Sequence, residues 1–517
     1  GGQYTFGGVQ QFLSGVSSLF LGAPVGQDDA VRDARQWTFA NYVNDQWKVS
    51  QKLTLTLGLR YEPTTQITER RNKFQALTNA PFGTGFTPVK NALAKNPSLK
   101  NFDPRVGFAW DVFGDHKTSI RGGIGTFHTI IVDRHVLSNY WNNAPYVTRV
   151  QIAGVVPTPF VGGINLPSQP TTSIGADYNI KDSPYMIQYN LSVQRELGAG
   201  NILSVGYIGS RGLHLFIVGD RNAPVPVTNA QGVRTFATGT VNPNTGLTVI
   251  AARPRINPAF GLLNTSFPGG SSNYNSLQVG FTRKLARGAQ VQLSYTWSRS
   301  MDFGSAGNIN ETGGGTAMQF QDPYNFRADY ARSTFDRPHN LRINGIAPLP
   351  FKGNVFVEGW QVSGIMSAVS GYPFTVNTGF DRAGLGSQLG LPLRPNYVAG
   401  CEQRLGQPNR WFNPACYTIP GVGELGNLGR NTVTGPNLVN TDISLTKDTK
   451  VSEKFNIQFR AEMFNVFNHT NFGIPPNQGA FLSAATPTGA APNPSAGIIS
   501  FTSTSSRQIQ LGVKLLF

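Results

Sequence analysis

The chain has 517 residues, of which 39% are hydrophobic and only 14% charged, and it contains 59 glycines and 34 prolines. This composition excludes a coiled coil and fits many short strands joined by turn-rich loops. The net charge of +16 could suit a nucleic-acid-binding protein, but the Lys and Arg residues are scattered singly instead of clustering on one patch. We expect no nucleic-acid partner, and an anionic lumen ligand or contact with lipopolysaccharide accounts better for the charge.

No run of the sequence approaches the roughly 18 apolar residues that a membrane-spanning helix needs. A membrane-spanning part must therefore be a β-barrel. No composition shift or charged linker divides the chain, although soluble cores stop growing at about 250–300 residues. The first ten residues, GGQYTFGGVQ, contain no Met, no basic segment and no apolar signal core. We interpret the chain as a fragment that lost its front end.

Thirteen stretches alternate apolar and polar residues with the two-residue period of a strand. Twelve of them form pairs joined by short turns, and the last stretch stands alone. In chain order they are 37–48 with 52–61, 104–113 with 117–129, 186–197 with 200–211, 274–285 with 288–299, 338–349 with 353–370, 437–449 with 452–466, and finally 507–517. This layout predicts an antiparallel meander.

Each predicted strand has one apolar and one polar face. A soluble sandwich can show such alternation, but a barrel with lipid outside and water inside explains both faces on nearly every strand. The expected lipid-facing residues include Leu53, Leu55, Leu57, Phe455, Ile457, Phe459, Ile509, Leu511 and Val513. The expected lumen-facing residues include Lys454, Arg460, Gln508, Gln510 and Lys514.

The connections between the pairs are long, at roughly 62–103, 130–185, 212–273, 300–337, 371–436 and 467–506. Structureless loops of this length are uncommon in compact soluble domains. Outer-membrane barrels have short periplasmic turns and long extracellular loops. If Phe517 lies at the periplasmic rim, every short turn falls on the periplasmic side. The long loops also argue against a passive porin.

Several phrases are more specific than this pattern. They are NYVNDQWKVSQKLTLTLGLRYE (41–62), DPRVGFAWDVFGDHKTSIRGGIGTFH (103–128), YMIQYNLSVQRELGAGNILSVGYIGSRGLHL (185–215), YNSLQVGFTRKLARGAQVQLSYTWSRSMD (274–302), FDRPHNLRINGIAPLPF (335–351) and FRAEMFNVFNHTNFG (459–473). Together they closely resemble the barrel of TonB-dependent receptors of the Oar-like subgroup, over most of residues 36–517.

The resemblance implies an all-β, antiparallel transmembrane β-barrel that is partial, with about 13–14 of about 22 strands. Residues 1–517 would be its carboxy-terminal portion. The plug with its TonB box, the amino-terminal regulatory-like domain and about nine leading strands of about 22 would be absent from this chain.

The resemblance also implies a function and a location. The complete protein would be an outer-membrane receptor of a Gram-negative cell that takes up a large or scarce ligand with energy from TonB, and not an enzyme. Its partners would be outer-membrane lipid, the TonB complex through the missing amino-terminal region, an extracellular ligand of unknown identity and the barrel assembly machinery. The apolar end formed by Val513, Leu515 and Phe517 would be the assembly signal. The alternative is a surface adhesion or structural barrel without import.

Few residues suggest a chemical site, and we predict no catalytic, cofactor or metal site. Cys401 and Cys416 lie in one external loop with no His nearby, and an oxidising compartment favours a disulfide over metal ligation. His128 and His135 are close in sequence but lack a third ligand, so we interpret them as residues of a solvated loop. The dense charges of 322–340 predict a salt network, in a loop that either contacts ligand or folds back on the rim.

Overall fold

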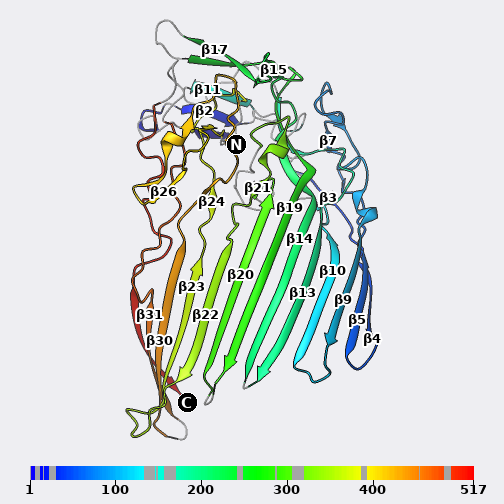
Figure 1. The fold of residues 1–517 in the computed structure, drawn as a ribbon. Helices are drawn as coiled ribbons and strands as arrows, with labels where there is room; N and C mark the ends of the chain where they lie inside the picture. Colours follow the sequence, from blue (N-terminus) through cyan, green and yellow to red (C-terminus); the bar gives the residue numbers. More distant parts are fainter. Residues whose placement is uncertain are drawn as a thin grey trace.

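The computed structural model describes residues 2–5, 12–15, 17–22, 29, 31–132, 146, 150–156, 171–198, 200–241, 248–285, 288–305, 320–385, 393–452, 455–481 and 491–517. One large sheet dominates it (Figure 1). Its main path consists of β4 (Asn41–Lys48), β5 (Leu53–Tyr61), β9 (Phe102–Asp111), β10 (Thr118–His128), β13 (Tyr185–Gly198), β14 (Asn201–Asp220), β19 (Phe260–Lys284), β20 (Gln290–Asp302), β22 (His339–Pro348), β23 (Trp360–Val369), β30 (Leu438–Lys450), β31 (Asn456–Phe464) and β32 (Gln508–Leu516).

Each strand of this path pairs antiparallel with the next strand along it, and the path follows the chain order. The thirteen predicted strands and their meander are therefore confirmed. Two strands join the sheet that the alternation did not predict. They are β12 (Thr171–Ala176), which runs parallel to β19, and β21 (Ala331–Arg332), which pairs with β20.

The register shows that the sheet has one apolar face, which we call the lipid face. Directly paired residues point to the same side of a sheet, so a chain of partners traces one face. From β5 to β30 one such row reads Leu53, Trp110, Ile120, Val193, Val205, Val279, Tyr295, Leu341, Ala368 and Val439. Many large side chains of this face are exposed, including Leu57, Val106, Ile124, Leu191, Tyr207 and Trp297. Lipid covers such a band in a membrane barrel.

The opposite face is polar, and we call it the lumen face. The row one residue away from the apolar one reads Asp111, Ser119, Gln194, Ser204, Gly280, Ser294, Arg342, Ser367 and Asn440. On the last two strands, Phe459 pairs with Val513 on the lipid face, whereas Gln458 pairs with Lys514 on the lumen face. The predicted division of residues between two faces is thus confirmed for the strands, and Lys454 lies outside the described residues.

The two ends of the sheet differ as predicted. At the periplasmic end, the strands are joined by the turns 49–52, 112–117, 199–200, 285–289, 349–359 and 451–455. At the extracellular end, the connections are 62–101, 129–184, 221–259, 303–338, 370–437 and 465–507. Figure 1 shows these long segments gathered above the sheet with their short strands.

The long connections and the first residues of the chain contain short strands and 3-10 helices. The strands are β1 (Gly2–Thr5), β2 (Ser17–Gly22), β3 (Ala34–Arg35), β6 (Thr68–Glu69), β7 (Gln75–Ala76), β8 (Thr87–Pro88), β11 (Val150–Val156), β15 (Val227–Thr228), β16 (Arg234–Thr235), β17 (Ala237–Val241), β18 (Thr248–Ala252), β24 (Pro373–Phe374), β25 (Asn396–Tyr397), β26 (Arg404–Gln407), β27 (Arg410–Phe412), β28 (Tyr417–Thr418) and β29 (Val433–Thr434). The 3-10 helices are η1 (Pro97–Lys100), η3 (Phe326–Asp329) and η4 (Pro414–Cys416). No helix in the described ranges is long and apolar enough to cross a membrane.

The hairpin of β14 and β19 is longer than the sequence predicts. The loop expected at 212–273 is a loop only at 221–259, because both strands continue past the rim with shifts of register near Leu215. Alternation stops in this extension, where the adjacent residues Ile217 and Val218 are both buried. Strands covered on both faces read as continuous apolar runs, so the period of two could not reveal them.

The strand predicted at 353–370 begins instead at Trp360. The residues before it form a long turn with positive φ at Gly353 and Gly359. A Cβ atom added to Gly359 would lie 2.2 Å from the carbonyl oxygen of Asp448, so only glycine allows the turn to approach β30 this closely.

The sheet has two edges. β4 and β32 lie at opposite ends of the strand order, and within the described residues they do not pair with each other. Figure 1 shows β4 at the right of the sheet and β31, the neighbour of β32, at the left.

Candidate ligand-binding cap

The long connections fold into a compact layer that we call the cap, comprising the described residues of 62–101, 129–184, 221–259, 303–338, 370–437 and 465–507. It has three buried apolar clusters of its own. The largest joins two connections that are separate in sequence, because Phe374, Val376, Phe412 and Tyr417 of the segment 370–437 pack with Ala480 and Phe481 of the segment 465–507. The described parts of these extracellular connections therefore pack against one another around buried apolar side chains.

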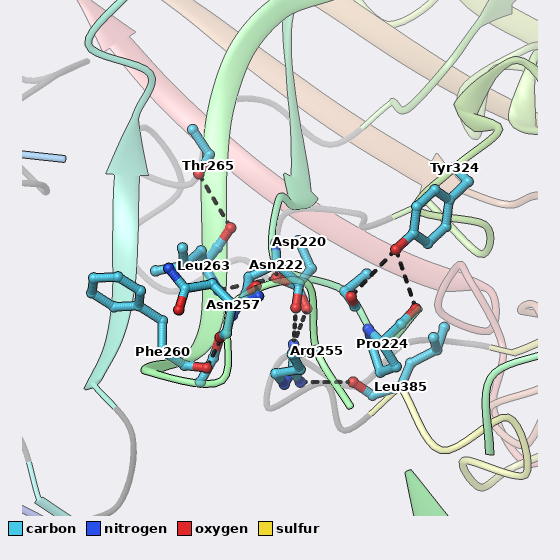
Figure 2. Close-up of polar contacts among 12 residues, drawn as sticks. Asp220, Asn222, Pro224, Arg255, Asn257, Phe260, Leu263, Thr265, Tyr324 and Leu385 are labelled. Carbon is cyan, nitrogen blue, oxygen red and sulfur yellow. Dashed lines mark hydrogen bonds and ion pairs between the residues drawn. The ribbon is translucent and has the colours of Figure 1, made fainter. Parts of the chain in front are cut away.

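A buried amide at the end of β14 connects the segments of the cap (Figure 2). The Asn222 side chain is fully buried, and its Nδ2 donates to the carbonyl oxygens of Asn257, Phe260 and Gly261, each at 2.9 Å. Its Oδ1 accepts the backbone N–H of Asn257 at 2.7 Å. This amide satisfies the backbone of the turn that leads into β19, which places that turn against the end of β14.

Two neighbours of Asn222 extend the contacts to other segments. Arg255 donates to Asp220 at 2.5 Å and to the carbonyl of Leu385 at 3.1 Å, which links 221–259 to 370–437. Asn257 Nδ2 donates to the carbonyls of Pro81 and Gly83, at 2.8 and 2.9 Å, which links it to 62–101. Figure 2 shows Arg255 between Asp220 and Leu385. We call Asp220, Asn222, Arg255 and Asn257 the polar hub.

Ion pairs fasten the end of β20 and the segment 303–338 to the segment 370–437. Arg430 contacts Asp302 at 2.5 Å, and Arg394 contacts Asp329 at 2.5 Å; all four side chains are at most 8% exposed. Asp336 accepts from Arg332 at 2.8 Å and from the backbone N–H of Ser300 at 2.7 Å. The salt network predicted in 322–340 is confirmed, and this loop folds back on the rim. Removing one partner of a buried ion pair would leave an uncompensated charge in the cap.

Arg382 differs from the other buried arginines of the cap. Arg382, Arg394 and Arg430 are all at most 6% exposed, but Arg382 makes no ion pair within the described part of the chain. Its Nε donates to the carbonyl of Pro420 at 2.8 Å, and its Nη1 has no partner there. Burial lowers the pKa of this guanidinium. A buried cation without a counter-ion is costly, so this position favours an anionic group.

A disulfide braces an exposed hairpin of the cap. Cys401 and Cys416 have sulfur atoms 1.96 Å apart and Cα atoms 5.3 Å apart. Between them, the tip 404–410 of the β26–β27 hairpin is exposed throughout. Cys416 is fully buried in the largest apolar cluster, which anchors the base of the hairpin. The two cysteines that the sequence predicts to bond are thus placed together by the structure.

The comparisons with known proteins agree with this architecture. A family model described as an outer membrane beta barrel domain matches residues 1–510. The chain belongs to this family. It is accordingly an outer-membrane protein, and the membership supports the prediction that it is not an enzyme. No curated protein sequence matches the chain.

A comparison with solved structures finds other outer-membrane proteins that are similar to the chain at low sequence identity. The outer membrane transporter YddB from Escherichia coli is 11% identical, with a TM-score of 0.45, over 96% of this chain and 55% of that one. The siderophore receptor PirA from Acinetobacter baumannii is 9% identical, with a TM-score of 0.44, over 96% of this chain and 50% of that one. The ferripyoverdine receptor of Pseudomonas aeruginosa is 11% identical, with a TM-score of 0.42, over 94% of this chain and 39% of that one. The chain thus spans about half the length of these structures or less.

The remaining predicted site residues of the barrel lie as follows. Val513 and Leu515 are on the lipid face of β32, and Phe517 is 96% exposed with its ring centroid 6.4 Å from that of Phe455. Within the described residues, no three or more His, Cys, Asp or Glu side chains are placed to hold a metal ion. His135 lies outside the described residues.

The interpretation of His128 as a solvated loop residue is wrong. It is the last residue of β10, and its Nδ1 lies 2.7 Å from Oδ1 of the buried Asp103. Asp103 of the neighbouring strand β9 thus holds the His128 side chain at the rim. The sequence spacing of the two residues does not reveal this contact.

Sequence reasoning missed the polar hub and Arg382. The hub residues lie in a stretch without strand alternation, and their partners are far away in the sequence; Asn257 and Pro81 are 176 residues apart. The sequence RPRINP at 253–258 is dense in Asn, Arg and Pro, which is unusual for a flexible loop and could have indicated an ordered segment. It does not identify the residues that this segment contacts.

Proposed function

We propose that this barrel is the carboxy-terminal part of a receptor that takes up a large or scarce ligand with energy from TonB. The observation that carries the proposal is the cap, a folded layer with apolar clusters and buried ion pairs above a polar-lined sheet. An ordered outer surface can select a ligand, whereas a passive pore needs only an open lumen. The resemblance of the strand phrases to TonB-dependent receptors supports the same function.

The open sheet supports the proposal that further strands complete the barrel. A β-structure in lipid must leave no unpaired edge, because the hydrocarbon offers no hydrogen bonds to free N–H and C=O groups. β4 and β32 each have one free edge in the described sheet. Barrels with about 22 strands enclose a plug, and such a barrel would accommodate the strands seen here. In this proposal the plug and its TonB box belong to the complete protein, as do the Oar-like features.

The ligand would carry an anionic group. Arg382 is the buried cation of the cap that lacks a counter-ion among the described residues, and the chain has a net charge of +16. The net positive charge would attract an anionic ligand, and such a ligand could compensate the buried Arg382 only if its binding moved the segments of the cap that cover this side chain.

The test measures binding of the complete protein, purified from outer membranes, to the purified periplasmic domain of TonB. We expect saturable binding that is lost when the TonB box preceding the barrel is deleted, while outer-membrane levels stay normal. Lack of binding, or the absence of a plug and TonB box from the complete gene, would overturn the proposal in favour of an adhesion or structural barrel.

A further inference from the structure

The turn between β22 and β23, residues 349–359, has an unusual surface for the periplasmic end of a barrel. We call it the foot. Phe351, Val355, Phe356 and Val357 are 52%, 49%, 78% and 41% exposed. Figure 1 shows this yellow-green turn at the lower left end of the sheet, near the carboxy terminus. A turn that faced only water would not need four exposed apolar side chains.

Two side chains of the lipid face hold the foot in place. Trp360 and Lys447 are register partners, in one row with Phe459 and Val513. The Trp360 indole N–H donates to the carbonyl of Phe356 at 3.1 Å. Lys447 Nζ donates to the carbonyls of Val355 and Glu358, at 2.7 and 2.6 Å. Because both donors stand on the lipid face, the foot folds over that face and away from the lumen.

The lipid face beside the foot is itself apolar down to the end of the strands. Ile457 pairs with Leu515, and the rings of Phe455 and Phe517 meet one step further toward the periplasm. All four side chains are exposed. The apolar surface of the foot therefore continues an apolar band that lipid already covers.

The foot also has polar groups suited to a membrane surface. Lys352 is exposed, and the Nζ of Lys447 lies over the Trp360 ring, 5.6 Å from the ring centroid. An exposed lysine such as Lys352 is typical of the membrane interface, where its amine meets phosphate groups. The foot also contains one carboxylate, Glu358, which lipid phosphates would repel. This carboxylate accepts the backbone N–H of Gly353 at 2.8 Å and so closes the turn.

We propose that the foot is a membrane anchor that inserts Phe351, Val355 and Phe356 into the boundary between headgroups and acyl chains of the inner leaflet. The occupant of this surface is a phospholipid layer. The proposal rests on the outer-membrane location of the barrel and is independent of whether the receptor is energised by TonB.

The test uses the complete protein, reconstituted in vesicles of phosphatidylethanolamine and phosphatidylglycerol. A Phe356→Cys variant carries an environment-sensitive fluorophore, while Cys401 and Cys416 stay bonded to each other. We expect blue-shifted emission and at least about twofold quenching by lipids brominated in their acyl chains, as insertion at this depth requires. Adding Lys447→Met, which keeps the stem but removes the donor, should reduce the quenching by releasing the foot.

Two control positions separate insertion from exposure. His116→Cys labels the turn 112–117 at the same end, where the His116 side chain is 90% exposed. Phe82→Cys labels an equally apolar position of the cap that is 69% exposed. Both should keep aqueous emission and no quenching. Quenching at position 356 as weak as at 116 would overturn the proposal, as would an apolar environment at 356 that arises only when periplasmic proteins are added.

Discussion

At the scale of single residues, Asn222 illustrates how one side chain can position several loops. A primary amide has two N–H donors and an acceptor oxygen, and here the donors serve three carbonyls while the oxygen accepts a backbone N–H. Inside a protein such bonds are worth more than in water, and each is expensive to leave unmade. The rigidity of the cap therefore depends on a few buried polar groups as well as on its apolar clusters.

Asn222→Ala should destabilise the cap by at least about 1–3 kcal/mol, because it leaves buried carbonyls without donors. The β-sheet has its own register and should remain folded. Limited trypsin digestion should therefore cut the cap faster, while the heat-modifiable mobility that reports the barrel stays unchanged. Asn409→Ala, in the exposed hairpin tip, is the matched control. Equal digestion rates for the two variants would show that the hub is dispensable.

Tyr417 makes the cap sensitive to alkaline pH. Burial raises the pKa of its phenol, whose hydroxyl lies 3.1 Å from Oε1 of Gln403. A raised folded-state pKa contributes stability that is fully present below the unfolded value of about 10 and is lost as the pH rises above it. The cap should thus loosen above about pH 10, as followed by protease sensitivity. In Tyr417→Phe this pH dependence should weaken, and an unchanged profile would contradict the role of Tyr417.

At the scale of elements, the strands could be predicted from the sequence because their signal is local. Alternation over a few residues decides which face each side chain takes, so Val193 and Gln194 could be assigned to opposite faces without knowing their partners. The extension of β14 and β19 and the start of β23 could not be predicted in this way. In the first case both faces are buried, and in the second the turn is shaped by Gly359 against β30.

The cap could be predicted only in part, since its contacts join residues far apart in the chain. The cysteine pair was a local signal, with a sequence separation of 15. Arg430 and Asp302 are 128 residues apart, and nothing near either residue identifies the other. Charge density around 322–340 predicted a salt network but not which segment of the chain would supply its arginines.

The β26–β27 hairpin depends on the bond between Cys401 and Cys416. For a separation of 15 residues, closing the loop is worth on the order of 3 kcal/mol in the chain-entropy model. Replacing both cysteines by serine should therefore speed trypsin cleavage at Arg404 and Arg410, in the exposed tip. The native protein, denatured without reductant, should show no free thiol. Two titratable thiols in that assay would contradict the bond.

At the scale of the whole molecule, two faces of one sheet meet two solvents. Val193 and Gln194 are adjacent in β13 and both are exposed, one on the lipid face and one on the lumen face. An arginine on the lipid side of a barrel costs about 2–4 kcal/mol near mid-bilayer, whereas the lumen tolerates charge. Val193→Arg in the complete protein should therefore lower outer-membrane levels and thermal stability, and Gln194→Arg should not. Reversed effects would mean that the faces are assigned the wrong way round.

The carboxy terminus tests how the barrel is assembled. Phe517 is 96% exposed and ends the apolar series of β32, beside Phe455. We expect Phe517→Asp to lower the amount of the complete protein in the outer membrane far more than Phe517→Tyr. A charge at the rim costs a finished barrel only about 0–1 kcal/mol, too little to unfold it. The loss should therefore appear as slow or failed insertion, with unfolded protein left in the periplasm. Outer-membrane levels and heat-modifiable mobility measure both variants, and normal levels of the Asp variant would show that Phe517 is only the end of a strand.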